Sequence, residues 1–301
     1  MRALLGVALL ATIGSGCAGF DSLVVGTTSR DYLIHIPDRV AESKSPAPLV
    51  LVFHGGGSGA RSMRSYSRFD EVADEHGFVV VYPEGTGPGW NDGREGPAIG
   101  ASEESVDDVA FVRELIATVS ARIPIDRDRI YATGISNGAM FSLRLACELG
   151  EVLAAIAPVA GSLPEPLLAR CRPARPISLL LIHGTNDEIV PYDGGPVIQE
   201  RGRVAGVDKT IEVFRDSNQC AGVAVESQID QVKTDETRVL RATWATCLEG
   251  AVIERDRIEG GGHTWPGSTS MIDFVRGTVS EEIDAPVRIW AFFAAHPRQA
   301  R

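Results

Sequence analysis

A serine between two glycines is the strongest chemical signal in the sequence. Residues 134–138 read GISNG, with Ser136 at the centre. They follow a β-rich run, Arg129 to Thr133, and precede a helical pattern that starts near Ala139. A sharp strand-to-helix turn needs small residues on both sides of the serine, and it raises the hydroxyl at the carboxyl end of a sheet strand. We therefore expect Ser136 to be a nucleophile for acyl transfer rather than a serine that only caps a turn.

A glycine loop could stabilise the negative charge that such an attack creates. Residues 54–57 read HGGG and follow a continuous apolar run. An oxyanion hole needs backbone N–H groups that point at one place, and glycines let the backbone approach the substrate closely. We expect the two donors to be the N–H of Gly56, with Gly57 as the alternative, and the N–H of Asn137. His54 is expected to hold the shape of the loop.

A serine nucleophile also needs a general base and an acid that orients the base. Asp187 lies in a loop directly after a strand-like run, and Glu188 and Asp193 are the fallback acids. His263 lies in a glycine-rich loop after a later strand-like run, whereas His296 lies at the end of the last predicted helix. In hydrolases with this type of turn the chain order is serine, acid, histidine. We therefore predict a triad of Ser136, Asp187 and His263.

Alternating strand-like and helix-like segments must position these residues. Buried apolar strands that alternate with helices indicate a mostly parallel sheet covered on both faces, so the expected fold class is α/β, an α/β-hydrolase fold. The predicted strands are residues 32–36, 49–53, 78–82, 129–133, 153–159, 178–182, 240–244 and 252–258, and the predicted helices are residues 62–76, 107–123, 139–149, 209–217 and 286–295. No repeat or low-complexity linker interrupts the alternation, so residues 30–297 are expected to form a single catalytic domain.

The first residues have the pattern of an export signal. Arg2 precedes an apolar run, Leu4 to Ile13, which is too short to span a membrane as a helix. Small residues directly before Cys17 are typical of a bacterial lipoprotein site, and simple cleavage near the same place is the alternative. We expect residues 1–16 to be a signal peptide, Cys17 to be lipidated, and residues 17–29 to be a linker. The expected location is extracellular or anchored to the cell envelope, with membrane contact only through the lipid.

The remaining cysteines support an oxidising compartment. Without Cys17 four of the five remain, which allows two disulfides in three possible pairings. Sequence neighbours pair most naturally, as Cys147 with Cys171 and Cys220 with Cys247, although sequence alone does not fix the connectivity. The alternative is a set of free, buried thiols.

Composition excludes several classes of function. The chain has 301 residues, with 40 acidic and 29 basic side chains and a net charge of −11. This acidic balance argues against nucleic acid as a partner. No phosphate loop, dinucleotide fingerprint or metal-ligand cluster is present in the sequence, so we expect no cofactor and no metal. The oligomeric state cannot be predicted.

Several stretches resemble the secreted esterase and polyhydroxybutyrate depolymerase family, which includes feruloyl esterases. They extend over nearly the whole chain in the order of the family. The stretches are LVLVFHGGGSGA (49–60), VVYPEGTGPGWND (80–92), SVDDVAFVREL (105–115), RIYATGISNGAMFSLRLACE (129–148), AAIAPVAGSLP (154–164), LLLIHGTNDEIVPYDGG (179–195) and GGGHTWPG (260–267). The resemblance implies the same triad, and a substrate pocket shaped by Trp90 and Trp265.

The resemblance also implies the substrate class. The expected substrates are polyester oligomers and hydroxycinnamoyl or acetyl esters of polysaccharides. Family members often carry cysteines in the loop after the Trp-Asn pair, and residues 91–105 have none. The chain also ends soon after its last predicted helix, without the polymer-binding module of many depolymerases. Both departures favour small, soluble esters over solid polymer.

Two other functions are compatible with the same motifs. A serine peptidase of the prolyl-oligopeptidase type shares the triad order, but it usually has an additional propeller domain. A non-catalytic binding lipoprotein on a hydrolase scaffold usually lacks a triad residue, and this chain has all three.

Overall fold

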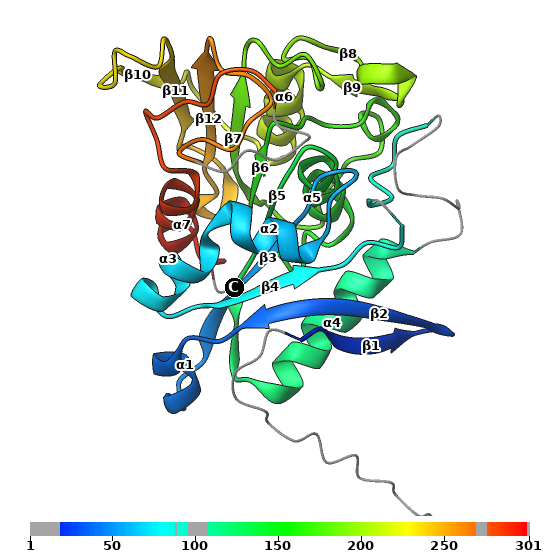
Figure 1. Ribbon diagram of the computed structural model, residues 1–301. Coiled ribbons are helices and arrows are strands. Elements are labelled where there is room, and N and C mark those ends of the chain that lie inside the picture. The colour runs from blue at the N-terminus through cyan, green and yellow to red at the C-terminus, as the bar shows by residue number, and fades with distance from the viewer. Residues whose placement is uncertain (1–18, 88, 96–106, 269–275, 300–301) are drawn as a thin grey trace, which may run out of the picture.

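The centre of the molecule is a ten-stranded sheet whose middle strands are parallel (Figure 1). The computed structural model describes residues 19–87, 89–95, 107–268 and 276–299. Across the sheet the strands are β1 (Asp21–Val25), β2 (Thr28–His35), β4 (Val79–Pro83), β3 (Ala47–Phe53), β5 (Ile125–Ile135), β6 (Ala155–Val159), β7 (Ser178–Gly184), β12 (Ile253–Glu259), β11 (Arg238–Trp244) and β10 (Val225–Ile229). Strands β4, β3, β5, β6, β7 and β12 run parallel, and antiparallel pairs extend both edges. The predicted α/β fold class is confirmed.

Helices cover both faces of this sheet. Side chains of α4, α5 and α6 pack in one apolar cluster, and side chains of α2, α3 and α7 pack in another. The helices are α1 (Asp38–Glu42), α2 (Ala60–Ser67), α3 (Phe69–His76), α4 (Asp108–Arg122), α5 (Asn137–Glu148), α6 (Val207–Ser217) and α7 (Ala285–Ala295). A small second sheet, β8 (Gly194–Pro196) with β9 (Arg203–Ala205), lies between β7 and α6 in the chain.

Strand β3 shows why the middle of the sheet is so apolar. All seven of its residues are buried. Leu51 and Phe53 point into the cluster with α4 and α5, whereas Val50 and Val52 point into the cluster with α2 and α7. Because a strand covered on both faces has no solvent side, its sequence shows a continuous apolar run instead of alternation.

Two segments differ from the sequence-based expectation. The predicted helix 62–76 is two helices, because Arg68 adopts a left-handed conformation with φ 56° between α2 and α3. The predicted linker 17–29 is also wrong in its second half. Strand β1 pairs there with β2, with Asp21 opposite Tyr32, so the sheet begins earlier than the apolar pattern indicated. Partly exposed edge strands have a weak apolar signal.

Both favoured cysteine pairs form disulfides. Cys147 in α5 bonds to Cys171, and Cys220 after α6 bonds to Cys247. The predicted signal peptide and Cys17 lie outside the described residues. Within the described ranges, no helix is both long and apolar enough to cross a membrane.

Candidate active site

Ser136 stands at the junction of β5 and α5 in a strained turn. Its backbone angles are φ 58° and ψ −120°, which a residue with a side chain rarely adopts. The turn is held by the Ser136 N–H, which donates to the Val159 carbonyl at 3.0 Å. On the inner side, a Cβ at Gly138 would lie 2.6 Å from the His54 carbonyl oxygen. Glycine is therefore required where this turn passes the glycine loop.

Asp187 and His263 come from two neighbouring strands and meet at the same edge of the sheet. Asp187 follows β7, His263 follows β12, and these strands are parallel neighbours. His263 Nδ1 lies 2.8 Å from Asp187 Oδ2. The other oxygen, Oδ1, accepts the N–H groups of Ile189 at 2.9 Å and Val190 at 2.8 Å. Of the three acids considered from the sequence, Asp187 is therefore the one positioned beside His263.

A second histidine also contacts this carboxylate. His183 is fully buried, and its Nε2 lies 3.1 Å from Asp187 Oδ2 and 2.8 Å from the Val190 carbonyl oxygen. Burial alone would raise the pKa of Asp187, but hydrogen bonds from His183 and His263 outweigh it and hold the pKa well below its usual value. Asp187 is therefore ionised throughout the neutral range. His183 lies only four residues before Asp187 but carries no sequence motif that marks it as part of the site.

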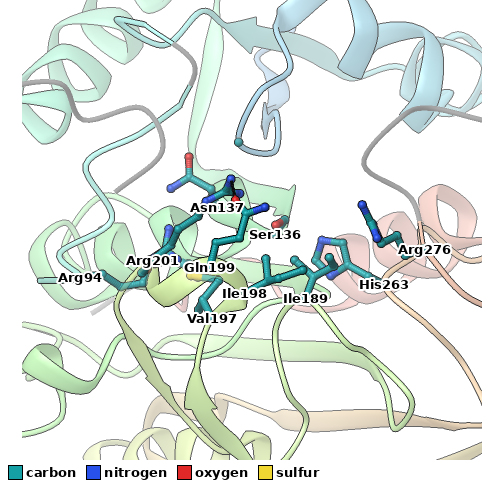
Figure 2. A pocket seen from close by; sticks show the side chains of 12 residues that line it. Arg94, Ser136, Asn137, Ile189, Val197, Ile198, Gln199, Arg201, His263 and Arg276 are labelled. Carbon is teal, nitrogen blue, oxygen red and sulfur yellow. Dashed lines mark hydrogen bonds between the residues drawn. The ribbon is translucent and has the colours of Figure 1, made fainter. Parts of the chain in front are cut away.

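Ser136 and His263 border a pocket of about 220 Å³. Figure 2 shows Ser136 and His263 lining it together, with Asn137 beside the serine. Gly56 also lines the pocket, and a Cβ at the preceding Gly55 would lie 3.5 Å from the Ser136 Cβ. The predicted nucleophile, base and both oxyanion donors thus border one space.

The glycine loop is held by His54, as expected from the sequence. His54 is completely buried. Its Nδ1 lies 2.9 Å from the Gly55 carbonyl oxygen, and its Nε2 accepts the Gly85 N–H at 3.1 Å. The first contact requires a proton on Nδ1 and the second requires none on Nε2. Burial also lowers the pKa of His54, so the ring is the neutral tautomer that satisfies both contacts.

Trp90 is not a pocket residue, which corrects the expectation from the family resemblance. Its side chain is completely buried, and its ring stacks on Phe141 at 5.2 Å between centroids. Its Nε1–H donates to the His54 carbonyl at 3.0 Å, and its backbone exchanges hydrogen bonds with the Asn137 side chain at 2.7 and 3.0 Å. Trp90 therefore braces the turn and the glycine loop from behind.

Trp265 is likewise buried rather than exposed to substrate. Its ring packs against Tyr66 and Phe69, with centroids 6.4 and 6.3 Å away. The Trp265 backbone N–H donates to the Tyr66 hydroxyl oxygen at 3.1 Å, which fixes the chain just after His263. The expectation that Trp265 shapes the substrate pocket was wrong because its position two residues after His263 does not show which way the side chain points.

Most of the side chains that line the pocket were not predicted from the sequence. Apolar residues come from α5 and from the segment after Asp187, and charged residues come from three loops. They are Arg94, Met140, Ile189, Val197, Ile198, Gln199, Arg201 and Arg276. Most lie in irregular segments with no motif, so only their place after a catalytic loop could have suggested them.

Comparisons with known proteins agree with this architecture. A family model described as esterase PHB depolymerase matches residues 30–164. "Putative esterase NocK" of Nocardia uniformis subsp. tsuyamanensis is 33% identical over 261 residues, which cover 82% of this chain and 74% of that protein. "Feruloyl esterase B" of Piromyces equi is 28% identical, over 82% of this chain and 45% of its own length.

A solved structure shows the same fold at low sequence identity. The acetyl xylan esterase from Aspergillus awamori aligns with a TM-score of 0.57 and 14% identity, over 82% of this chain and 94% of that one. The matches to NocK and to the family model extend across the serine turn and, for NocK, most of the chain. The chain therefore belongs to the esterase and PHB depolymerase family of α/β-hydrolases and is an esterase-type hydrolase.

Proposed function

We propose that the protein is an exported serine carboxylesterase that works through an acyl-enzyme. The observation that carries this proposal is the meeting of three segments at one pocket. Ser136 is raised there by a strained turn, and His263 lies beside it with Nδ1 2.8 Å from the Asp187 carboxylate. A nucleophile, a base and an acid that orients the base are the parts that acyl transfer requires.

Each of the three residues has a distinct task in this mechanism. His263 Nε2 takes the Ser136 proton while Oγ attacks the ester carbonyl, and it then gives the proton to the departing alcohol. Asp187 accepts the Nδ1 proton, fixes the tautomer and stabilises the imidazolium. A water molecule, activated by the same histidine, then releases the acid and restores the serine. No cofactor takes part in these steps.

The backbone supplies the oxyanion hole. The N–H groups of Gly56 and Asn137 are the donors, and both residues border the pocket beside Ser136. The Asn137 side chain cannot turn into the pocket, because Trp90 and Asp92 hold it, with Nδ2 2.6 Å from Asp92 Oδ2. The backbone N–H of Asn137 is therefore the group that donates to the oxyanion. One such donor stabilises the transition state by about 3 kcal/mol.

The substrates are small esters. A pocket of about 220 Å³ holds a short acyl chain or a single substituted ring. Polyester oligomers and hydroxycinnamoyl or acetyl esters of polysaccharides remain the candidate classes. Relatives named feruloyl esterase B and bifunctional acetylxylan esterase/xylanase XynS20E, from Neocallimastix patriciarum, support the last two. This chain spans only 45% and 34% of those two proteins.

Replacing the nucleophile tests the mechanism. Ser136→Ala removes the attacking oxygen but keeps the turn, so kcat/KM for p-nitrophenyl butyrate should fall roughly a million-fold while Tm changes little. Ser62→Ala, on the exposed face of α2, is the matched control and should behave as wild type.

Two further assays distinguish a serine esterase from a binding protein and from a peptidase. A fluorophosphonate probe should label the wild type and not Ser136→Ala. Absence of label on wild type would favour a binding protein, and faster cleavage of a matched anilide than of the ester would favour a peptidase. Ester hydrolysis that survives in Ser136→Ala would reject the triad.

Export completes the proposal. The two disulfides support an oxidising compartment. In this scheme residues 1–16 are removed as a signal peptide, Cys17 carries a lipid anchor, and residues 30–297 form the catalytic domain. Mass spectrometry of the mature N-terminus decides the point: a diacylglyceryl cysteine at Cys17 is expected, and an unmodified terminus near it would replace anchoring by free secretion.

A further inference from the structure

The pocket is positively charged although the protein is strongly acidic. The chain has a net charge of −11, yet the side chains that line the pocket within the described residues include three arginines and no carboxylate. Surface charges farther away than about 8 Å are largely screened at physiological salt. A substrate in the pocket therefore experiences mainly these arginines: Arg94, Arg201 and Arg276.

Arg94 is the arginine whose charge is already balanced. It is almost fully buried and grips the Asp92 carboxylate, with Nη2 2.8 Å and Nε 2.9 Å from Oδ2. Its Nη1 donates to the backbone carbonyl of Arg201 at 2.8 Å. Arg94 thereby fixes the position of the Arg201 backbone, and its charge is balanced by Asp92.

Arg201 is left without a counter-ion. It is partly buried, and within the described residues no carboxylate pairs with it; its guanidinium donates to the neutral amide of Gln199. Burial, and then the charge of Arg94, lower the pKa of Arg201. The charge of a bound anion would offset both effects.

The segment that presents Arg201 is held in a costly conformation. Gln199 and Glu200 both have left-handed backbones, with φ 60° and 56°. Neither is glycine, so each costs on the order of 1 kcal/mol. Figure 2 shows Gln199 and Arg201 reaching towards the side of the pocket where Asn137 lies. Strain of this kind is common where a side chain must face a ligand.

Arg276 lies on the other side of the serine. Its backbone pairs with that of His263 at 2.7 and 3.3 Å, and its side chain is exposed. Because His263 must protonate the departing alcohol, the alcohol lies towards Arg276 and the acyl group extends towards Arg201. The better desolvated cation thus faces the acyl group, where attraction to an anion is stronger than at an exposed site.

We propose that the enzyme prefers esters whose acyl part ends in a carboxylate, which Arg201 binds. The guanidinium fork matches the two oxygens of a carboxylate in a bidentate geometry. The substrate class is then the half-ester of a short dicarboxylic acid, or an ester with an acidic acyl substituent. This inference rests on the proposed serine esterase function and adds the substrate class to it.

The test compares two esters that differ only at the end of the acyl chain. The mono-p-nitrophenyl ester of adipic acid carries the carboxylate, and the p-nitrophenyl ester of adipamic acid carries an isosteric neutral amide. Wild type should prefer the first by about tenfold or more in kcat/KM, the contribution of a hydrogen-bonded charge, and the preference should shrink as salt is raised. Arg201→Gln should remove most of the preference, and Arg201→Lys should keep part of it.

Two controls assign the effect to Arg201. Arg203→Gln makes the same change in net charge two residues away, on an exposed side chain that pairs with Glu165 at 2.9 Å, and it should keep the preference. Arg276→Gln should lower it less than Arg201→Gln. Hydrolysis of both esters by wild type with equal kcat/KM would overturn the proposal. A preference that survives in Arg201→Gln, or one lost only in Arg276→Gln, would also overturn it.

Binding separates this inference from the esterase mechanism. In Ser136→Ala the adipate half-ester is not consumed, so its affinity can be measured by calorimetry with and without Arg201→Gln. Tighter binding of the half-ester than of the amide, dependent on Arg201, supports the inference even if wild type hydrolyses neither ester. Hydrolysis of both esters without discrimination keeps the esterase mechanism and rejects carboxylate recognition.

Discussion

The two sides of Ser136 are built on different principles. The inner side consists of residues 54–57, 90–92 and 134–138, and the outer side consists of residues 189–201 with Arg276. On the inner side, backbone atoms of the turn and of the glycine loop lie in close contact, and the buried polar side chains of His54, Asp92 and Asn137 have hydrogen-bond partners. The outer side carries two arginines without a described counter-ion and two left-handed residues. Transition-state stabilisation needs hydrogen-bond donors in fixed positions, whereas substrate preference can depend on the side of the pocket whose conformation is less tightly held.

The largest effect on stability is expected at Gly138, where the inner side has no space for an added methyl group. A methyl group at Gly138 would overlap the carbonyl oxygens of Phe53 and His54, so Gly138→Ala should lower the free energy of unfolding by about 3 kcal/mol and abolish activity. Gly57 has φ 81° but no neighbour within 4 Å of an added Cβ, so Gly57→Ala should cost only about 1 kcal/mol. Denaturant unfolding measures both, and equal losses would show that the inner side is not tightly packed.

An intermediate effect is expected at His183, which lies behind the triad. His183→Leu removes the contact with Asp187, but it also removes Nδ1, a buried atom that has no partner among the described residues. Stability should therefore change modestly. Without this anchor the Asp187 carboxylate is less well placed, and kcat should fall roughly ten- to hundredfold. His183→Gln, which can still donate a hydrogen bond, should recover part of the rate.

The pH profile distinguishes positioning from a general structural role. Asp187 has a lowered pKa in the folded protein, so the stability and activity that depend on its ionisation are present at neutral pH and lost as pH falls through that pKa. Removing the His183 hydrogen bond raises the pKa of Asp187. The acid-induced loss of the free energy of unfolding should therefore end at higher pH in His183→Leu than in wild type, and an unchanged pH dependence of stability would argue that His183 only fills space.

The triad and the glycine loop could be predicted from sequence because each part is local. The serine turn, the glycine loop and the loops after β7 and β12 are each defined by a few neighbouring residues next to a buried strand. Parallel strands then bring their carboxyl ends to one edge, which is how Asp187 and His263 could be paired from residues 76 positions apart. The α/β fold follows from the same apolar runs.

The outer side could not be predicted because its residues act through long-range placement. Nothing near Arg201 in the sequence shows that Arg94, 107 positions earlier, holds its backbone. The prediction that Trp90 and Trp265 shape the substrate pocket was wrong for a related reason. Both lie in loops next to the site, but each side chain points inward and packs behind it. Edge strand β1 was missed because its residues are only partly buried.

The smallest effect is expected at Gln199 on the outer side. Gln199→Gly relieves a left-handed backbone of φ 60°, a gain of about 1 kcal/mol, but glycine loses about as much in conformational entropy on folding. The free energy of unfolding should therefore change by less than about 1 kcal/mol, far less than at Gly138. The amide that holds the Arg201 guanidinium is lost with the side chain, so discrimination between the adipate and adipamate esters should weaken. A loss of stability as large as that of Gly138→Ala would show that both sides are equally rigid, and the division between a fixed inner side and an adaptable outer side would fail.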